Sequence, residues 1–239
     1  MSRTALSAVA IVVAGLLLGT RLVGPGLAAA LPLTSQALTA YRTCIVTATP
    51  TTTTIVTDAT VRQGSPTTNF GTSTTDTIAS GGSANRRLYV RADLSGCSPA
   101  IPAGATVRLA TLRLYASVLP AACRTVDVFD ATVSWSESTV TWNNQPFGTT
   151  LNNPPSATAS ATFTIGTPTG CTYHAVGTIG IPVTTDVAGW VAGTAANYGW
   201  MLRDDAESSG TTYTSTWSGK ELGTLAQAPQ LVVTYVTVP

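Results

Sequence analysis

Few side chains in this sequence have the type and spacing that catalysis requires. His174 is the only histidine, it lies in a stretch rich in glycine and threonine, and no Gly-x-Ser-x-Gly segment occurs. A nucleophilic triad needs a histidine held beside its nucleophile. We therefore interpret His174 as a solvated loop residue and expect no catalysis of this kind.

The densest acidic group in the chain consists of Asp204, Asp205 and Glu207. Paired carboxylates hydrolyse glycosidic bonds, and several carboxylate oxygens together bind Ca²⁺. Adjacent acids in a loop are more often a solvated turn, and that is the interpretation we favour. A structural calcium site is the alternative for these three residues, and a hydrolase or lyase that uses them is a further hypothesis. No other cofactor is expected.

Sugar binding requires aromatic faces that stack on pyranose rings and planar polar groups that contact neighbouring hydroxyls. Arg87, Tyr89 and Arg91 alternate along one predicted strand, and Arg113 and Tyr115 alternate along another. Residues two apart share one face of a strand, so we expect each set on an outward face, where it is a candidate ligand-binding surface. The alternative is that the arginines pair with acids on neighbouring strands.

Two further residues are candidates for ligand binding. Trp217 alternates with polar neighbours, and Lys220 follows it closely. A core position is the equal alternative for Trp217. Trp135, Trp142 and Trp190 are flanked by β-branched or helical patterns, so we predict that they are buried.

These candidates lie in a chain whose pattern is typical of β-structure, because short alternating segments are separated by clusters of turn formers. Residues 87–94 alternate cleanly, whereas residues 107–118 change parity part-way, which predicts a β-bulge. Apolar residues spaced by three and four after Pro182 predict one short helix that ends at Gly193. We predict an all-β fold, a jelly-roll-like antiparallel two-sheet sandwich with about ten strands and one short helix.

The first residues are expected to be a targeting segment rather than part of the fold. An apolar run over 5–18 follows Arg3, and alanines at 28–30 provide a cleavage site. We predict a signal peptide over 1–30, with cleavage after Ala40 or retention as an uncleaved anchor as alternatives. Residues 31–52 are a threonine-rich lead-in and residues 53–237 a single sandwich domain, although a glycosylated stalk is the alternative for its first threonines.

The charge pattern excludes one class of partner. Charged residues are 10% of the chain, the formal net charge is +1, and Lys220 is the only lysine. Nucleic-acid binding needs a clustered excess of Lys and Arg, so no nucleic-acid partner is expected. No second apolar segment is long enough to span a membrane after signal removal. We expect a secreted monomer.

The four cysteines are an even number in a chain predicted to be exported, which indicates two disulfides. Metal binding is the alternative, but no Cys-x-x-Cys spacing occurs. Three pairings are possible and the sequence does not choose among them. We favour Cys44 with Cys97 and Cys123 with Cys171.

Several segments together resemble one known family. In chain order they are DATVRQGSPTTNFG, NRRLYVRADLS, IPAGATVRLATLRLYAS, VSWSESTVTWNNQP, TTDVAGWVAGTAANYGWMLRD and WSGKE. From about Thr57 to Tyr235 the chain resembles the DNRLRE domain, also grouped as carbohydrate-binding module family 96. The resemblance implies a secreted β-sandwich that occurs beside polysaccharide-degrading domains, binds polysaccharide in at least some members and has no catalytic activity.

The sequence therefore predicts a secreted, non-catalytic module that binds a polysaccharide or a cell-wall glycan and is extracellular or associated with the cell wall. The alternative is a structural or adhesive cell-surface protein that binds no glycan. Low charge, many threonines and two disulfides would suit either role.

Overall fold

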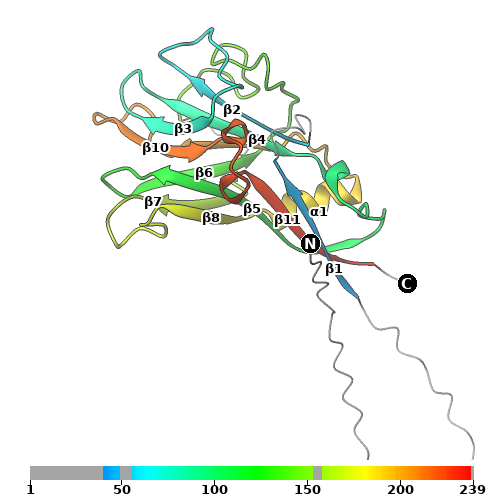
Figure 1. Cartoon of the computed structure of the whole chain (residues 1–239). Coiled ribbons are helices and arrows are strands. Elements are labelled where there is room, and N and C mark those ends of the chain that lie inside the picture. The colour runs from blue at the N-terminus through cyan, green and yellow to red at the C-terminus, as the bar shows by residue number, and fades with distance from the viewer. Residues whose placement is uncertain (1–39, 49–54, 153–157, 238–239) are drawn as a thin grey trace, which may run out of the picture. The chain divides into compact units, whose positions relative to one another are not determined.

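The computed structural model describes residues 40–48, 55–152 and 158–237. In these ranges the chain forms eleven strands, one α-helix and three short 3₁₀ helices (Figure 1). All strand pairs are antiparallel, so the predicted all-β fold is confirmed. The strands are β1 Tyr41–Thr47, β2 Val56–Arg62, β3 Thr75–Ser80, β4 Arg86–Ala92, β5 Thr106–Val118, β6 Arg124–Asp130, β7 Ala161–Ile165, β8 Gly177–Pro182, β9 Trp200–Asp204, β10 Tyr213–Ser218 and β11 Gln230–Val236; the helices are η1 Leu94–Gly96, α1 Thr184–Ala192, η2 Lys220–Leu222 and η3 Leu225–Gln227.

The strands form two layers that hydrogen bonds join into one continuous sheet. The first layer has the order β2-β4-β9-β6-β7, and in the second layer β5 pairs with β8 on one side and with β11 on the other, with β1 beyond β11. Strand β10 pairs with β3 and with the end of β5, and a single pair between Ala79 and Arg86 connects β3 to β4. This arrangement is the sandwich that the sequence predicts.

The main core lies between the two layers, because alternate residues of each strand point inward. Leu88 and Val90 of β4 and Leu112 and Leu114 of β5 are all buried in this core. Burying one such aliphatic side chain contributes about 1.5–3 kcal/mol. The inward alternation therefore fixes which side chains each strand presents on its outer face.

The predicted bulge in the long strand is present at Arg108. Leu109 lies opposite Thr234, whereas Val107 lies opposite Tyr235, so one extra residue is inserted into β5. As a result Val107 is buried and Leu109 is exposed, although the two residues are only two positions apart.

The predicted helix is α1, and Gly193 ends it in the left-handed conformation with a φ of 71°. Its N-cap residue is Val183, which makes no side-chain cap bond. Val187 and Trp190 are buried, and the Trp190 ring packs on Trp200 with 4.7 Å between ring centroids. In the described ranges no helix has the length and hydrophobicity needed to cross a bilayer.

A second, smaller apolar cluster lies on the outer face of the first layer. Residues 131–152, which we call the covering loop, pack over this face with Val140 and Trp142 buried against Tyr89 of β4. Trp135 lies at the edge of the cluster and is only partly buried. The predicted burial of Trp142 and Trp190 is therefore confirmed, and that of Trp135 is incomplete.

The favoured disulfide pairing is confirmed: Cys44 bonds to Cys97, and Cys123 bonds to Cys171. The first bridge attaches strand β1 to the segment that follows η1. Strand β1 itself is a correction, because the sequence assigned residues 41–47 to the lead-in. The predicted signal peptide, residues 1–30, lies outside the described residues.

Candidate functional site

The structure separates the two sets of arginine and tyrosine side chains that the sequence placed on outward faces. Arg87, Tyr89 and Arg91 belong to β4 in the first layer, whereas Arg113 and Tyr115 belong to β5 in the second layer. The expectation of exposure is wrong for Arg87 and Tyr89, which are fully buried. The covering loop buries them, and only Arg91 of this set is partly exposed.

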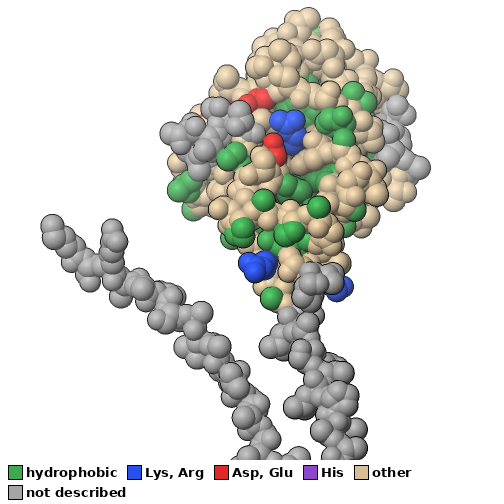
Figure 2. All heavy atoms as spheres, turned by 90° about the vertical axis from the view of Figure 1, so that its right-hand side faces the viewer, with side chains coloured by type: hydrophobic (Ala, Val, Ile, Leu, Met, Phe, Trp, Pro, Cys, Tyr) green, Lys and Arg blue, Asp and Glu red, His purple; other side chains and the backbone are tan. Residues whose placement is uncertain are grey.

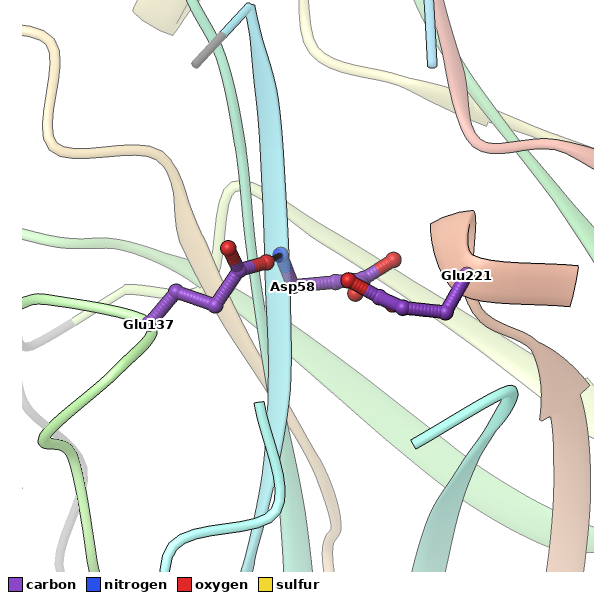
Figure 3. A group of neighbouring side chains, drawn as sticks. All are labelled: Asp58, Glu137 and Glu221. Atoms are coloured by element: carbon purple, nitrogen blue, oxygen red, sulfur yellow. Dashed lines mark hydrogen bonds between the residues drawn. The ribbon is translucent and has the colours of Figure 1, made fainter. Parts of the chain in front are cut away.

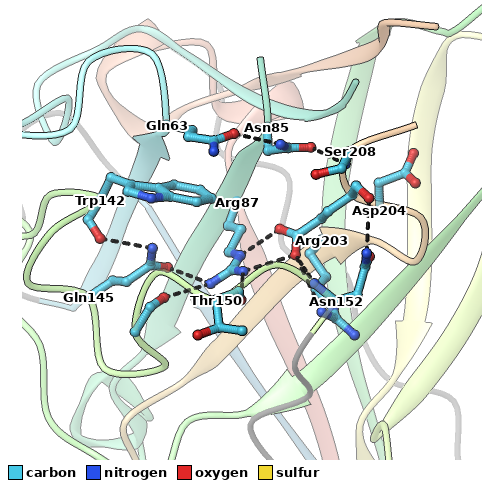
Figure 4. Close-up of polar contacts among 12 residues, drawn as sticks. Gln63, Asn85, Arg87, Trp142, Gln145, Thr150, Asn152, Arg203, Asp204 and Ser208 are labelled. Carbon is cyan, nitrogen blue, oxygen red and sulfur yellow. Dashed lines mark hydrogen bonds and ion pairs between the residues drawn. The ribbon is translucent and has the colours of Figure 1, made fainter. Parts of the chain in front are cut away.

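Arg87 is the centre of a buried polar network (Figure 4). Its Nε donates to Oε1 of Glu207 at 2.7 Å and its Nη2 donates to Oε2 at 2.9 Å. The remaining donors reach Oε1 of Gln145 at 3.1 Å and the carbonyl oxygens of Gly148 and Thr150, both at 2.9 Å. Three of the five acceptor atoms therefore lie in the covering loop, and this network holds the loop against β4.

The three acids proposed for calcium do not form a shared cluster of oxygens. Both carboxylate oxygens of Asp204 bond to Arg124, at 2.9 and 2.6 Å. Glu207 is buried and contacts Arg203 at 3.4 Å in addition to Arg87. Asp205 has 42% of its side chain exposed, and its Oδ1 lies 3.9 Å from Nη2 of Arg124. Arginines therefore compensate these acids, and a structural calcium site at these three residues stays a prediction.

Trp217 and Lys220 are also buried, so the structure does not place them on a ligand-binding surface. Trp217 belongs to the main core, and its Nε1 donates to Oγ of Ser215 at 2.9 Å. The Lys220 ammonium bonds to Glu221 and to Oε1 of Glu137, the latter at 3.1 Å. The core alternative for Trp217 is the one that the structure supports.

Among the described residues, one group of three potential metal ligands lies close together: Asp58, Glu137 and Glu221, with carboxylate oxygens within 4.8 Å of one another (Figure 3). The backbone N–H of Asp58 donates to Oε1 of Glu137 at 2.8 Å, and the backbone N–H of Lys220 donates to Oδ2 of Asp58 at 2.8 Å. The Lys220 ammonium already supplies a positive charge to this group. We therefore interpret the cluster as a largely buried ionic junction between β2, the covering loop and η2, in which Asp58 is buried and the two glutamates are partly exposed.

Burial dominates the electrostatics of this junction. It raises the pKa of Asp58 well above its ordinary value, and the nearby carboxylates of Asp76 and Glu221 raise it further. It also raises the pKa of Asp76 to about 7, although a hydrogen bond from Thr60 opposes the shift. For Lys220, burial lowers the pKa, but the bonds to the two glutamates outweigh this effect and raise it.

Sequence reasoning missed this junction because its members are far apart in the chain. Asp58, Glu137 and Glu221 come from the segments DATVR, WSES and WSGKE. Each acid stands alone in its own segment, so no local spacing marks the group. The available signal was that three of the segments that carry the family resemblance, DATVRQGSPTTNFG, VSWSESTVTWNNQP and WSGKE, each contain a single acid.

The outer face of the second layer is different, because in the described part of the chain nothing packs over it. Its outward residues alternate with the buried core residues of β1, β11, β5 and β8. We call it the open face; its residues are Thr43, Ile45, Thr47, Gln230, Val232, Thr234, Leu109, Thr111, Arg113, Tyr115 and Thr178.

A comparison with known families gives a clear result. A family model described as carbohydrate-binding module family 96 matches residues 49–235. The chain belongs to this family. No curated protein matches the sequence closely enough to count as a relative. The family match covers every strand from β2 to β10 and all but the last residue of β11.

Within this family 96 module, Arg113 and Tyr115 are the predicted ligand-binding residues that lie on the open face. Arg113 is exposed, lies between Gln230 of β11 and Gly180 of β8, and has no hydrogen bond or ion pair with the described residues. Tyr115, two residues further along β5, is partly exposed beside Thr178.

The module shows no concentrated positive charge on the face drawn in Figure 2, where charged side chains are few and scattered among hydrophobic and uncharged ones. His174 is exposed, and its ring nitrogen Nδ1 lies 3.3 Å from the carbonyl oxygen of Cys171.

Proposed function

We propose that the module binds a polysaccharide chain along the open face. The observation that carries the proposal is the pair of Arg113 and Tyr115, a guanidinium with no partner among the described residues and an aromatic ring on one uncovered sheet face. In a chain that belongs to a carbohydrate-binding family, such a pair provides both contacts that sugar rings need. An aromatic ring packs on the apolar face of a pyranose, and a planar guanidinium donates to two neighbouring oxygens.

The remainder of the open face favours a long ligand with little charge. Threonine hydroxyls alternate with the exposed aliphatic side chains of Ile45 and Leu109, which supply hydrogen-bonding and apolar contacts. Four neighbouring strands, about 4.8 Å apart, provide a surface that several sugar units can cross. Arg113 lies at the centre of this face and Arg108 at its end, beside the bulge, and no acid lies on it. With so few charges, a neutral polysaccharide fits better than a strongly acidic one.

We further propose that the module acts outside the cell and has no catalytic activity. Two disulfides support an oxidising compartment, since such bonds are rare in reducing ones. The predicted signal peptide supports the same compartment. Membership of a binding family supports recognition rather than turnover, and the acids at 204–207 are engaged by arginines.

The test is retention on a panel of insoluble cellulose, xylan, galactomannan, mixed-linkage glucan and polygalacturonate. We expect the mature protein to be retained on at least one neutral member. The variants Arg113→Ala and Tyr115→Ala should each weaken retention by about tenfold or more, since each removes about 1.5 kcal/mol of contact. The matched control is Arg42→Ala, which removes the same exposed charge outside the open face.

The alternative is an adhesive or structural role in which the open face binds protein. The exposed side chains of Tyr41, Ile45 and Leu109 favour this role, since contiguous exposed apolar groups mark interaction surfaces. Sedimentation of the free protein separates the two functions. A monomer that binds the glycan panel supports the first, and self-association without any glycan binding supports the second.

A further inference from the structure

A small hollow lies on the outer side of the covering loop and is not part of the open face. It has a volume of about 330 Å³, and one aromatic ring, that of Trp135, lines it among hydroxyl and amide side chains. We call it the Trp135 hollow; its lining residues are Ser134, Trp135, Ser136, Thr139, Val140 and Asn144.

The Trp135 ring is held in a fixed orientation. Its Nε1 donates to the carbonyl oxygen of Tyr198 at 2.7 Å, and Tyr89 packs edge-on against it with 5.5 Å between centroids. On the rim, Oδ1 of Asn144 accepts from the backbone N–H of Thr141 at 2.6 Å. A ring and rim that are already ordered lose little entropy when a ligand binds.

The polar groups around the ring have the chemistry that one sugar unit requires. The Ser134, Ser136, Thr139 and Asn144 side chains are exposed. Hydroxyl and amide groups both donate and accept, so they match the hydroxyls of a sugar better than they match an ion. No charged residue lines the hollow.

The Trp135 hollow and the open face point away from each other. The covering loop packs on the outer face of the first layer, the open face is the outer face of the second layer, and the main core lies between them. A straight polymer segment that lies along one of these surfaces therefore does not reach the other.

We propose that the Trp135 hollow is a second glycan-binding site and that the module cross-links two polysaccharide chains. This inference rests on the proposed function, because it needs the open face to bind glycan as well. Two weak sites on opposite faces give each molecule two attachments in a polymer network, and retention then exceeds that of either site alone.

Fluorescence quenching tests the hollow directly. The other four tryptophans are shielded, with exposures of 3% for Trp142, 8% for Trp190, 0% for Trp200 and 1% for Trp217. Iodide should therefore quench mainly Trp135. The probe is a hexasaccharide of the glycan that binds best in the panel. We expect it to protect Trp135 from iodide in the wild-type protein and in Arg113→Ala, in which binding to the open face is weakened and the hollow is unchanged.

Calorimetry and light scattering test the cross-linking. The wild-type protein should bind two hexasaccharides and should raise the scattering of the soluble polymer. Ser134→Arg, which fills the rim of the hollow with a longer side chain, should bind one hexasaccharide and should not raise the scattering. Arg113→Ala should behave in the same way through loss of the other site.

The outcomes separate the two proposals. If the protein binds a single hexasaccharide and Trp135 is not protected, the proposal of a second site is overturned, and the proposal that the open face binds glycan still stands. Protection of Trp135 that Ser134→Arg does not abolish would also overturn it. If no polysaccharide or hexasaccharide binds at all, the proposed function itself fails.

Discussion

Glu207→Gln is the sharpest test of how the covering loop is held. The substitution keeps the size of the side chain and removes its charge, so the guanidinium of Arg87 loses its ionic partner in a fully buried site. Both side chains have 0% exposure, and two hydrogen bonds of 2.7 and 2.9 Å join them. The new amide group also turns N–H donors toward the donors of Arg87.

The expected cost follows from these contacts. Removing one partner of a buried ion pair costs about 3–5 kcal/mol, because the other charge stays buried without compensation. Arg87 keeps the carbonyls of Gly148 and Thr150 and the face of Trp142, 4.8 Å from its guanidinium carbon, so we expect the lower half of this range. The free energy of unfolding should fall by about 3–4 kcal/mol.

The assay is equilibrium unfolding in urea with the disulfides intact, followed by tryptophan fluorescence and by circular dichroism to check that the transitions coincide. The matched control is Asp205→Asn, which neutralises an exposed acid 3.9 Å from Arg124 and should cost less than about 1 kcal/mol. A loss below about 1 kcal/mol for Glu207→Gln would refute the reasoning, since the pair would then behave like a surface ion pair.

Three more predictions concern stability and can be measured in the same way. Asp76, whose pKa burial raises to about 7, binds its proton more tightly in the folded state. Its contribution to stability is therefore largest below about pH 4 and is lost as the pH rises through about 7, and the free energy of unfolding should fall by up to about 4 kcal/mol over this range. Asp76→Asn should remove most of this pH dependence. If the variant and the wild-type protein show the same pH profile, the raised pKa of Asp76 is contradicted. Gly71→Ala should lower the free energy of unfolding by about 1–3 kcal/mol, because the added Cβ would lie 2.1 Å from the backbone oxygen of Glu137 in the covering loop. The control is Gly170→Ala, whose added Cβ has no atom within 4 Å and should change the stability little. Replacing Cys123 and Cys171 by alanine should cost about 2–5 kcal/mol, and equal stability of the variant would show that the loop they close is already ordered without the bond.

Much of the fold could be predicted from the sequence because strand alternation is a local signal. The clean alternation around Leu88 and the change of parity near Arg108 both correspond to the observed strands and bulge. The segment from Trp135 to Trp142, whose β-branched neighbours predicted that both tryptophans are buried, forms no strand and leaves Trp135 only partly buried. Strands β1 and β8 were missed, since threonine and glycine in these segments resemble loops until their partners in β11 and β5 are known.

The candidate site was harder to predict, because parity assigns a residue to an outer face and says nothing about what covers that face. Arg87 and Arg113 have the same local pattern, yet the covering loop buries the first and leaves the second exposed. The loop comes from 44 or more residues further along the chain, at Ala131 and beyond. Coverage of this kind depends on long-range contacts such as the bond from Arg87 to Gln145.

The Cys44–Cys97 bond also determines how the domain responds to mechanical load. Tyr41 of β1 lies opposite Val236 of β11, so pulling the two chain ends apart would unzip these antiparallel strands one pair at a time from that edge. Unzipping in this geometry reaches Cys44 after three pairs. At Cys44 the force is transmitted through the disulfide to Cys97, in the segment that follows η1. A domain pulled by its N-terminal end would therefore lose the first three residue pairs of β1 and then resist further unzipping at Cys44.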